Sequence, residues 1–508
     1  MSEANSLFLN KLTKTTKIRY FVLLLAQSII SLALDEFLIR LNIRNTRPSR
    51  SQLMMISNNI ENNPNHEASN AKVWAIAWPM ILSGISIPML GLVDTALLGH
   101  LDHPRYLAAV AIGAHVIAIL YLSFSFLRMG TTSLVSQSVG RARNNTAIGF
   151  SQGANNTTDS IIYRTLLMAA LFGVILTITI PWLIDSIILL MNASENIAGL
   201  AAEYIRIRLY SAPAAMMTFA ISGWLIGLKK TKAALALILF SNLINIILDT
   251  VFIVVMDMNS AGAAIASVIA EYSGLALGLV FVCRQTQLTT LKQWQSWLSP
   301  KAYQQILAMN AHLFVRTLLL FFTFNFFTAQ GASISDSVLA ANAILLQLVF
   351  FSAYVMDGFS YAAEVLCGEA TGSKQRKTFI HCVKICAIWL AATGLLFSAS
   401  FLLIGDVIIG LLSDMPKVMQ LAKQYMIWLV LMPLAGMLAY LLDGVFVGAG
   451  RTQPMHLTMW FSVVIVFLPV WWLTQGWQNH GLWFAFICFN LARGLSLAIV
   501  YPALLRKI

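Results

Sequence analysis

The chain has 508 residues, of which 58% are hydrophobic and only 11% are charged. Soluble domains carry about 25% charged residues, so this composition excludes an ordinary soluble protein and indicates a chain that crosses a membrane repeatedly. The net charge of +12 does not indicate nucleic-acid binding, because most basic residues of the apolar core lie in alternate loops between apolar stretches and form no single patch.

The first seventy residues differ in composition from the rest of the chain. An apolar segment at 20–34 is short for a membrane span and lies between two basic clusters. It is typical of a signal-like segment or of an interfacial helix. Alternatively, the natural start is Met54 or Met55. We therefore expect 1–70 to be an extension of the core, in which 1–53 is dispensable and the asparagine-rich stretch at 56–70 is disordered.

Twelve apolar runs follow, each long enough to cross about 30 Å of hydrocarbon. The predicted spans are 73–98, 107–139, 162–190, 203–227, 232–256, 261–283, 307–330, 337–366, 378–411, 424–447, 455–474 and 480–503. Spans 2, 8 and 9 are longer than the bilayer requires, so we expect them to tilt, bend or protrude. Basic residues follow the even-numbered spans, which predicts an inner (plasma) membrane protein with both ends of the core in the cytoplasm.

Two halves of this core resemble each other in sequence. The motif LAAVAI at 107–112 returns as LAANAI at 339–344, and IGLKKT at 226–231 returns as VGAGRT at 447–452. Each half has six spans, so the halves are parallel repeats related by an axis along the membrane normal. The predicted fold class is thus an all-α integral membrane protein with twelve transmembrane helices in two six-helix lobes around a central cleft. We expect an N-lobe at 71–284, a cytoplasmic linker at 285–306 and a C-lobe at 307–508.

Acidic residues inside the spans mark the candidate site, because charges in hydrocarbon are costly and tend to face functional cavities. Asp94 in span 1 and Asp249 in span 5 are predicted at similar depth near the outer surface, with Asn245 one helical turn before Asp249. Pro88 should let span 1 bend. Burial and a neighbouring like charge favour the protonated form of a carboxyl group, so such a pocket can load and release a proton. Ionised, the same oxygens can hold Na⁺. The structural alternative is that Asp94 pairs with Arg128 or caps a helix.

Further charges lie in other spans. They are Glu271 in span 6, Arg316 in span 7, Asp357 and Glu364 in span 8, Asp443 in span 10 and Arg493 in span 12. Asp357 and Glu364 share a helix face, and they are candidates for a C-lobe coupling site, for binding cationic substrate, or for ion pairs with Arg316 or Arg493. Four charges near span ends are expected to reach water: Asp185, Arg206, Arg208 and Asp406.

Several ordered motifs resemble the MATE multidrug exporters, and the DinF-like subgroup in particular. They include PMLGLVDTALLGHLDHPRYLAAVAIG at 88–113, NLINIILD at 242–249, YVMDGFSYAAE at 354–364 and LLDGVFVGAGRT at 441–452. The resemblance implies two six-helix lobes and export of bulky, often cationic organic compounds, coupled to inward movement of H⁺ or Na⁺. It assigns Asp94, Asn245, Asp249 and Ser267 to the N-lobe ion or proton site, and it matches Asp443 to an acid used by another branch. The Na⁺-using branch also has a glutamate in span 7, where this sequence has no acid, and this departure favours protons.

The sequence therefore predicts a secondary transporter that exports organic, cationic or amphipathic compounds in antiport with H⁺ by alternating access. We expect small-molecule substrates and the lipid bilayer as its partners, no cofactor, and a functional monomer. One alternative is a Na⁺-coupled exporter, and another is a flippase for lipid-linked oligosaccharides, which would need a strongly cationic cavity. An enzyme is not expected, because the sequence contains no H-E-x-x-H, G-x-S-x-G or phosphate-loop motif.

Overall fold

The computed structural model describes residues 69–99, 101, 103–147, 154–190, 194–286 and 300–508. The predicted extension, with its segment at 20–34, and most of the linker at 285–306 lie outside these residues. All regular structure in the described part of the chain is helical. Eleven of its helices are long and apolar enough to cross a membrane, or up to twelve if one bent pair counts as a single span, which confirms the predicted fold class.

The first lobe is built from the following segments. They are α4 (Asn70–Leu98), α5 (Pro104–Ser123), α6 (Phe126–Ala147), α7 (Ala154–Thr179), η2 (Ile180–Trp182), α8 (Ile184–Leu190), α9 (Glu195–Leu209), α10 (Ala212–Gly227), α11 (Thr231–Asp249), η3 (Thr250–Val255) and α12 (Asn259–Gln285).

The second lobe continues the chain. Its segments are α15 (Pro300–Ile334), α16 (Asp336–Gly372), α17 (Arg376–Leu412), α18 (Pro416–Gly448), α19 (Gln453–Trp460), η4 (Phe461–Phe467), α20 (Leu468–Leu473), η5 (Gln475–Trp477) and α21 (Asn479–Leu505).

The three long predicted spans behave differently. Span 2 breaks at Phe124, between α5 and α6. By contrast, α16 and α17 each continue for 37 residues. That is about 55 Å at 1.5 Å per residue, so both helices must tilt or extend beyond the hydrocarbon. Span 4 is bent by 52° between α9 and α10. The helix α4 runs without a break through Pro79 and Pro88, so a bend at Pro88 stays a prediction.

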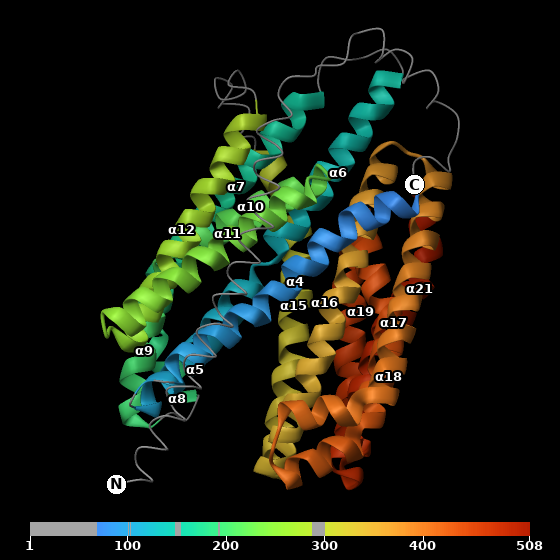
Figure 1. Ribbon diagram of the computed structural model, residues 1–508. Helices are drawn as coiled ribbons and strands as arrows, with labels where there is room; N and C mark the ends of the chain where they lie inside the picture. The colour runs from blue at the N-terminus through green and yellow to red at the C-terminus, as the bar shows by residue number, and fades with distance from the viewer. Residues whose placement is uncertain (1–68, 100, 102, 148–153, 191–193, 287–299) are drawn as a thin grey trace, which may run out of the picture.

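The two lobes meet at one end of the molecule and separate toward the other (Figure 1). We call the first the converging end; it holds the C-terminus, the last turns of α16 and the start of α11. Helix α16 makes the junction, because it packs against both α4 and α6 of the other lobe. Gly372 of α16 lies directly against the backbone of Gln137 in α6, and Gly140 of α6 lies against the backbone of Glu369. These glycines allow the two helices to touch at their main chains.

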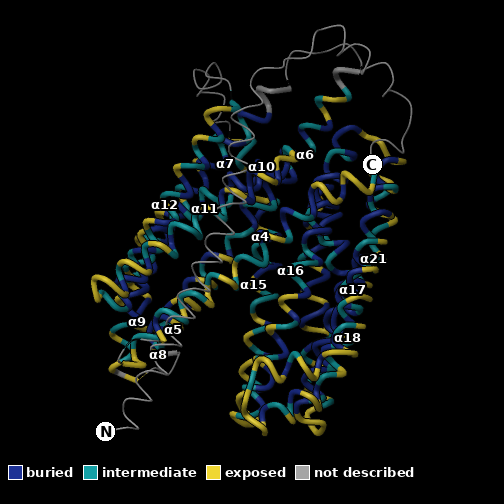
Figure 2. Tube along the Cα trace, viewed as in Figure 1, coloured by how far each residue is buried: buried dark blue, intermediate teal, exposed yellow. Residues whose placement is uncertain are grey.

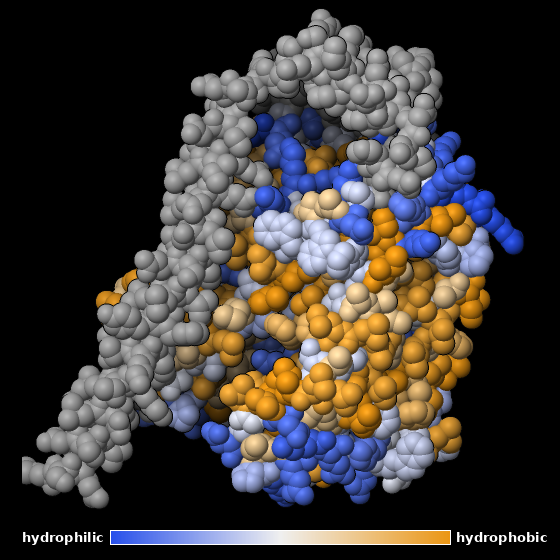
Figure 3. Space-filling view, turned by 45° about the vertical axis from the view of Figure 1, so that its right-hand side comes forward, coloured by the Kyte–Doolittle hydropathy of each residue, from blue (hydrophilic) through white to orange (hydrophobic). Residues whose placement is uncertain are grey.

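The buried core crosses from one lobe to the other. Its largest cluster includes Ala77 and Leu127 together with Phe359 and Ala363 of α16, and Figure 2 shows buried residues concentrated where the helices meet. Apolar side chains also cover the outside: Leu403 of α17 is 80% exposed. Figure 3 shows them as a hydrophobic band between hydrophilic ends. Such a band suits contact with lipid.

Candidate functional site

Helix packing brings the two predicted acids of the N-lobe together. Asp94 lies in the last turns of α4, Asp249 is the last residue of α11, and α4 packs against α11. The two carboxyl groups lie within hydrogen-bonding reach of each other. A carboxylate only accepts hydrogen bonds, so a bond between the two groups requires a proton on at least one of them. Directly after Asp249 the chain enters the π-helical segment η3, a local widening that often occurs at functional sites.

Asn245 and Ser267 complete this pocket. Asn245 lies one turn before Asp249 on α11, and its Nδ2 donates to Ser267 Oγ of α12 at 3.2 Å. Asn245 and Asp249 are 3% and 1% exposed. The remaining oxygens, Asn245 Oδ1 and both carboxyl oxygens of Asp249, are buried without a donor from any described residue other than Asp94. A buried acceptor without a donor costs about 1–3 kcal/mol, so a group that donates to these oxygens, or a cation, would stabilise this pocket.

An arginine that the sequence placed at a span end turns out to belong to the same pocket. The side chain of Arg208 is only 11% exposed, and its Nη2 donates to Glu271 Oε1 of α12 at 2.7 Å. It also interacts electrostatically with Asp94 and Asp249. The expectation that Arg208 reaches water is therefore wrong, because its guanidinium group is paired with Glu271 of α12 and lies over the ring of Tyr121 of α5. The side chains of Asp185, Arg206 and Asp406 are exposed, to 88%, 55% and 67%, as that expectation requires.

The hydroxyl of Tyr121 fixes that arginine's backbone. It donates to the carbonyl oxygen of Arg208 at 2.7 Å from helix α5. Tyr204, one turn before Arg208, is also buried and lies close to both acids. We did not identify either tyrosine from the sequence, because buried aromatic residues are abundant in any membrane helix.

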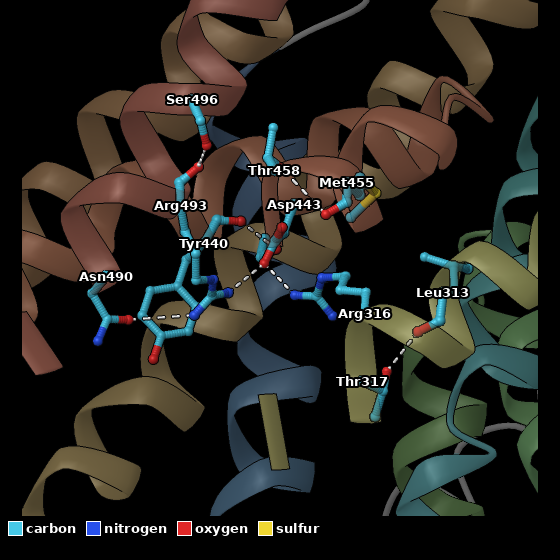
Figure 4. A network of polar contacts seen from close by, with 11 residues as sticks. Leu313, Arg316, Thr317, Tyr440, Asp443, Met455, Thr458, Asn490, Arg493 and Ser496 are labelled. Atoms are coloured by element: carbon cyan, nitrogen blue, oxygen red, sulfur yellow. Dashed lines mark hydrogen bonds and ion pairs between the residues drawn. The ribbon is translucent and has the colours of Figure 1, made fainter. Parts of the chain in front are cut away.

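A second charged cluster occupies the C-lobe, as Figure 4 shows. Asp443 of α18 accepts from Arg316 of α15 and, at 2.8 Å, from Nη2 of Arg493 of α21. Arg493 also donates to Asn490 Oδ1 at 3.3 Å. Both arginines are only 6% exposed. Asp443 is therefore held between two cations, and it is not a free carboxylate.

The other C-lobe acids have different surroundings. Glu364 of α16 lies 3.8 Å from Nη1 of Arg128, which belongs to α6 of the other lobe and stacks on the ring of Tyr361 at 4.4 Å. The alternatives of an Asp94–Arg128 pair and of Glu364 pairing with Arg316 or Arg493 are thus wrong. Among the described residues, no cation lies within ion-pair distance of Asp357, which lines a cavity together with Glu364 and Asp443.

Two cavities differ in size and chemistry. The charged C-lobe cavity has a volume of about 160 Å³, which is room for about five water molecules at roughly 30 Å³ each. The other has about 470 Å³ and lies between residues 85–92 of α4 and helices α15 and α16 of the opposite lobe. Pockets that bind drug-sized ligands measure roughly 300–1,000 Å³, so of these two cavities the second has a suitable volume. It is mostly apolar, with Pro88, Phe350 and Tyr354 among its walls.

Comparison with known proteins places this architecture in a family. The family model MatE matches residues 79–251 and 313–473, which is more than half of the chain and includes part of each lobe. The chain is 36% identical over 442 residues to DNA damage-inducible protein F of Escherichia coli, covering 85% of this chain and 92% of that protein. The chain belongs to the MATE family of multidrug efflux transporters.

More distant MATE proteins share the fold. The chain is 25% identical to Multidrug and toxin extrusion protein 1 of Danio rerio over 400 residues, which is 76% of this chain and 64% of that protein. Its structure superimposes on a variant of the Vibrio cholerae MATE transporter VcmN with a TM-score of 0.76 and 20% identity, covering 86% of this chain and 97% of that one. As a MATE protein, it is a multi-pass membrane protein of a transporter family. The family match includes Asp94, Asn245, Asp249 and Asp443, whereas Arg493 lies beyond it.

Proposed function

We propose that this protein exports amphipathic or cationic organic compounds in exchange for protons by alternating access. The observation that carries the proposal is the pair Asp94 and Asp249, whose carboxyl groups face each other while Asp249 is buried without any other donor. One proton shared by the pair removes the repulsion between two negative charges and gives a donor to one of the unpaired acceptors. A proton therefore binds this pocket in one conformation and leaves when rearrangement of α4 against α11 admits water.

The position of Arg208 favours a proton over Na⁺ as the coupling ion. Its guanidinium group interacts with both acids, and a second positive charge in the same pocket is repelled. A protonated carboxyl group is neutral and carries no such penalty. In addition, Na⁺ needs several oxygen ligands, and Ser267 Oγ already accepts from Asn245. A Na⁺ ion held by Asp94, Asn245 and Asp249 is the second candidate.

The cavity between the lobes supports the proposed substrates. Its volume of about 470 Å³ suits one organic molecule, and its apolar lining with a few polar groups such as Gln347 suits an amphipathic one. One wall is Pro88–Leu92 of α4, immediately before Asp94 in the same helix. Proton binding at Asp94 and substrate binding beside Met89 therefore act on one rigid element, which gives them a route for coupling.

The C-lobe cluster does not favour a flippase for phosphate-linked sugars. Such a ligand needs an excess of cationic groups, whereas the charged cavity holds the acids Asp357, Glu364 and Asp443 beside Arg316 and Arg493. We further propose that the protein acts in the plasma (inner) membrane as a monomer without a cofactor, with the converging end toward the cytoplasm. The basic loops of the sequence support this orientation.

The experiment is a flux assay in proteoliposomes with a fluorescent organic cation and an imposed gradient of either pH or Na⁺. We expect a pH gradient alone to drive uptake of the dye, and Asp94→Asn and Asp249→Asn each to abolish it, since an amide cannot bind the exchanged proton. The matched control is Asp414→Asn, which alters an exposed loop carboxylate and should keep the wild-type rate. Transport driven by Na⁺ without a pH gradient would instead establish the sodium alternative, and full transport by Asp94→Asn would refute the coupling role.

A further inference from the structure

An ionic contact joins the two lobes at the converging end, away from both charged clusters described above. Glu369 in the last turns of α16 pairs with Lys229 of the turn between α10 and α11. Its Oε1 also lies 3.8 Å from Nη1 of Arg143 in α6. The acid belongs to the C-lobe and both cations belong to the N-lobe, so these two pairs exist only while the lobes meet here.

The surroundings of Glu369 make this contact stronger than an ordinary surface ion pair. Its side chain is 15% exposed, compared with 34% for Lys229. Partial removal from water reduces the screening that makes exposed pairs nearly worthless. The backbone of Glu369 lies against Gly140, which fixes α16 against α6 at this position.

Neutral contacts from the same junction close the gap beside the ion pairs. Gln137 of α6 donates from Nε2 to the carbonyl oxygen of Gly448 in α18 at 2.9 Å. Gly450, with a φ of 67°, lies directly against the same glutamine side chain. A side chain at Gly450 would be strained at this φ and would displace Gln137. Helices α6, α16 and α18 therefore pack tightly at the converging end. In the ion pairs at this junction, Glu369 is the acid and Arg143 and Lys229 are the cations.

We propose that Glu369, Arg143 and Lys229 form a lock that holds the converging end shut and so stabilises the conformation that is open at the opposite end. The inference rests on the proposed alternating-access function, in which the lobes rock as rigid bodies. A contact made in only one of two conformations shifts the equilibrium by its own free energy. Breaking the lock therefore favours the conformation that opens at the converging end, without touching the acids that bind the proton.

The test measures the distance between the lobes at the converging end in the full-length protein. Spin labels are attached to Cys283 of α12, which is exposed, and to Gln453→Cys at the start of α19, also exposed. The other four cysteines are replaced by alanine. In the parent protein we expect the shorter distance to predominate, and in Glu369→Gln we expect the ratio of longer to shorter distance to rise roughly tenfold.

Three further variants separate a lock from a merely structural role. Lys374→Gln changes an exposed charge just beyond the same helix and should leave the distance distribution unchanged. Glu369→Lys should open the converging end further, because it places three cations together. Combining it with Arg143→Glu and Lys229→Glu restores opposite charges and should return the shorter distance. A Glu369→Gln protein with the parent distribution overturns the proposal.

Folding failure and failure of the transport proposal give different results. If Glu369→Lys yields no folded protein, the triple variant decides: recovery of folding with the parent distribution supports the lock, whereas folding with the distribution of Glu369→Gln refutes it. The distance measurement needs no ion gradient. If Asp94→Asn transports normally while Glu369→Gln opens the converging end, proton coupling at Asp94 fails and the lock stands.

Discussion

Single buried charges in this protein are mostly held by partners from other helices, and Asp443 is the clearest case. Arg316 and Arg493 approach it from α15 and α21, so three helices depend on one carboxylate. Taking charges out of water is costly, and a buried group that loses its counter-charge destabilises the fold far more than an exposed one does. Asp443 therefore has a structural role that its position in the sequence does not reveal.

We predict that Asp443→Asn lowers the stability of the folded protein by about 3–5 kcal/mol, because it leaves two buried guanidinium groups without an anion. The readout is the midpoint of thermal unfolding in detergent. The control is Asp406→Asn, whose carboxylate is 67% exposed and pairs with Lys423 at 3.4 Å, and which should lose less than about 1 kcal/mol. Equal midpoints for the two variants would contradict a structural role for Asp443.

In the N-lobe, Arg208 and Glu271 also form an ion pair between two helices. Arg208→Gln leaves the partly buried Glu271, whose side chain is 23% exposed, without its cation, so we expect proton-driven export to fall at least about tenfold. The double variant Arg208→Gln with Glu271→Gln removes both charges together and should regain part of the lost activity. Initial rates of dye uptake in proteoliposomes give this double-mutant cycle. A double variant as poor as the sum of the single ones would show that the pair acts independently.

At the scale of helices, close approach depends on small residues at defined crossings. Gly372 of α16 meets the backbone of Gln137 in α6, whereas Gly410 of α17 is exposed and has only the end of Met419 nearby. The same substitution therefore has different consequences at the two positions.

We predict that Gly372→Leu abolishes tight packing of α16 on α6, because its side chain would occupy space filled by main-chain atoms. The yield of monodisperse protein in size-exclusion chromatography should fall several-fold. Gly410→Leu, which adds the same side chain to a lipid-facing surface, should retain the parental yield. Normal yield and an unchanged interlobe distance in Gly372→Leu would mean that α6 and α16 do not need this contact.

Helix interruptions also decide where functional groups point. Arg208 lies in the last turn of α9, just before the bend to α10, and the π-helical segment begins directly after Asp249. Neither feature was predicted, because a single bent apolar stretch has the same composition as a straight one. For the break between α5 and α6, the sequence predicted only that the long span 2 tilts, bends or protrudes, and it did not predict the position of the break.

The whole molecule combines two similar bundles with an asymmetric distribution of charge. The N-lobe holds two acids in mutual contact near the separated end, and the C-lobe holds a carboxylate clamped by two arginines. Arg128 and Glu364 connect the lobes in the interior, while Glu369 connects them at the converging end. Repeats in sequence therefore do not imply equal chemistry in the two lobes.

From hydropathy and spacing, which are local properties of one helix, the sequence predicted the membrane class and nearly all of the helices. The repeat and the depth of Asp94 and Asp249 in the bilayer stay predictions. The boundaries at 71–284, 285–306 and 307–508 and the roles of the predicted site residues stay predictions. Which charge meets which became visible in the packed helices alone. Ion pairs such as Arg316–Asp443 join residues far apart in the chain, and buried charges choose partners by the packing of whole helices, which no local pattern encodes.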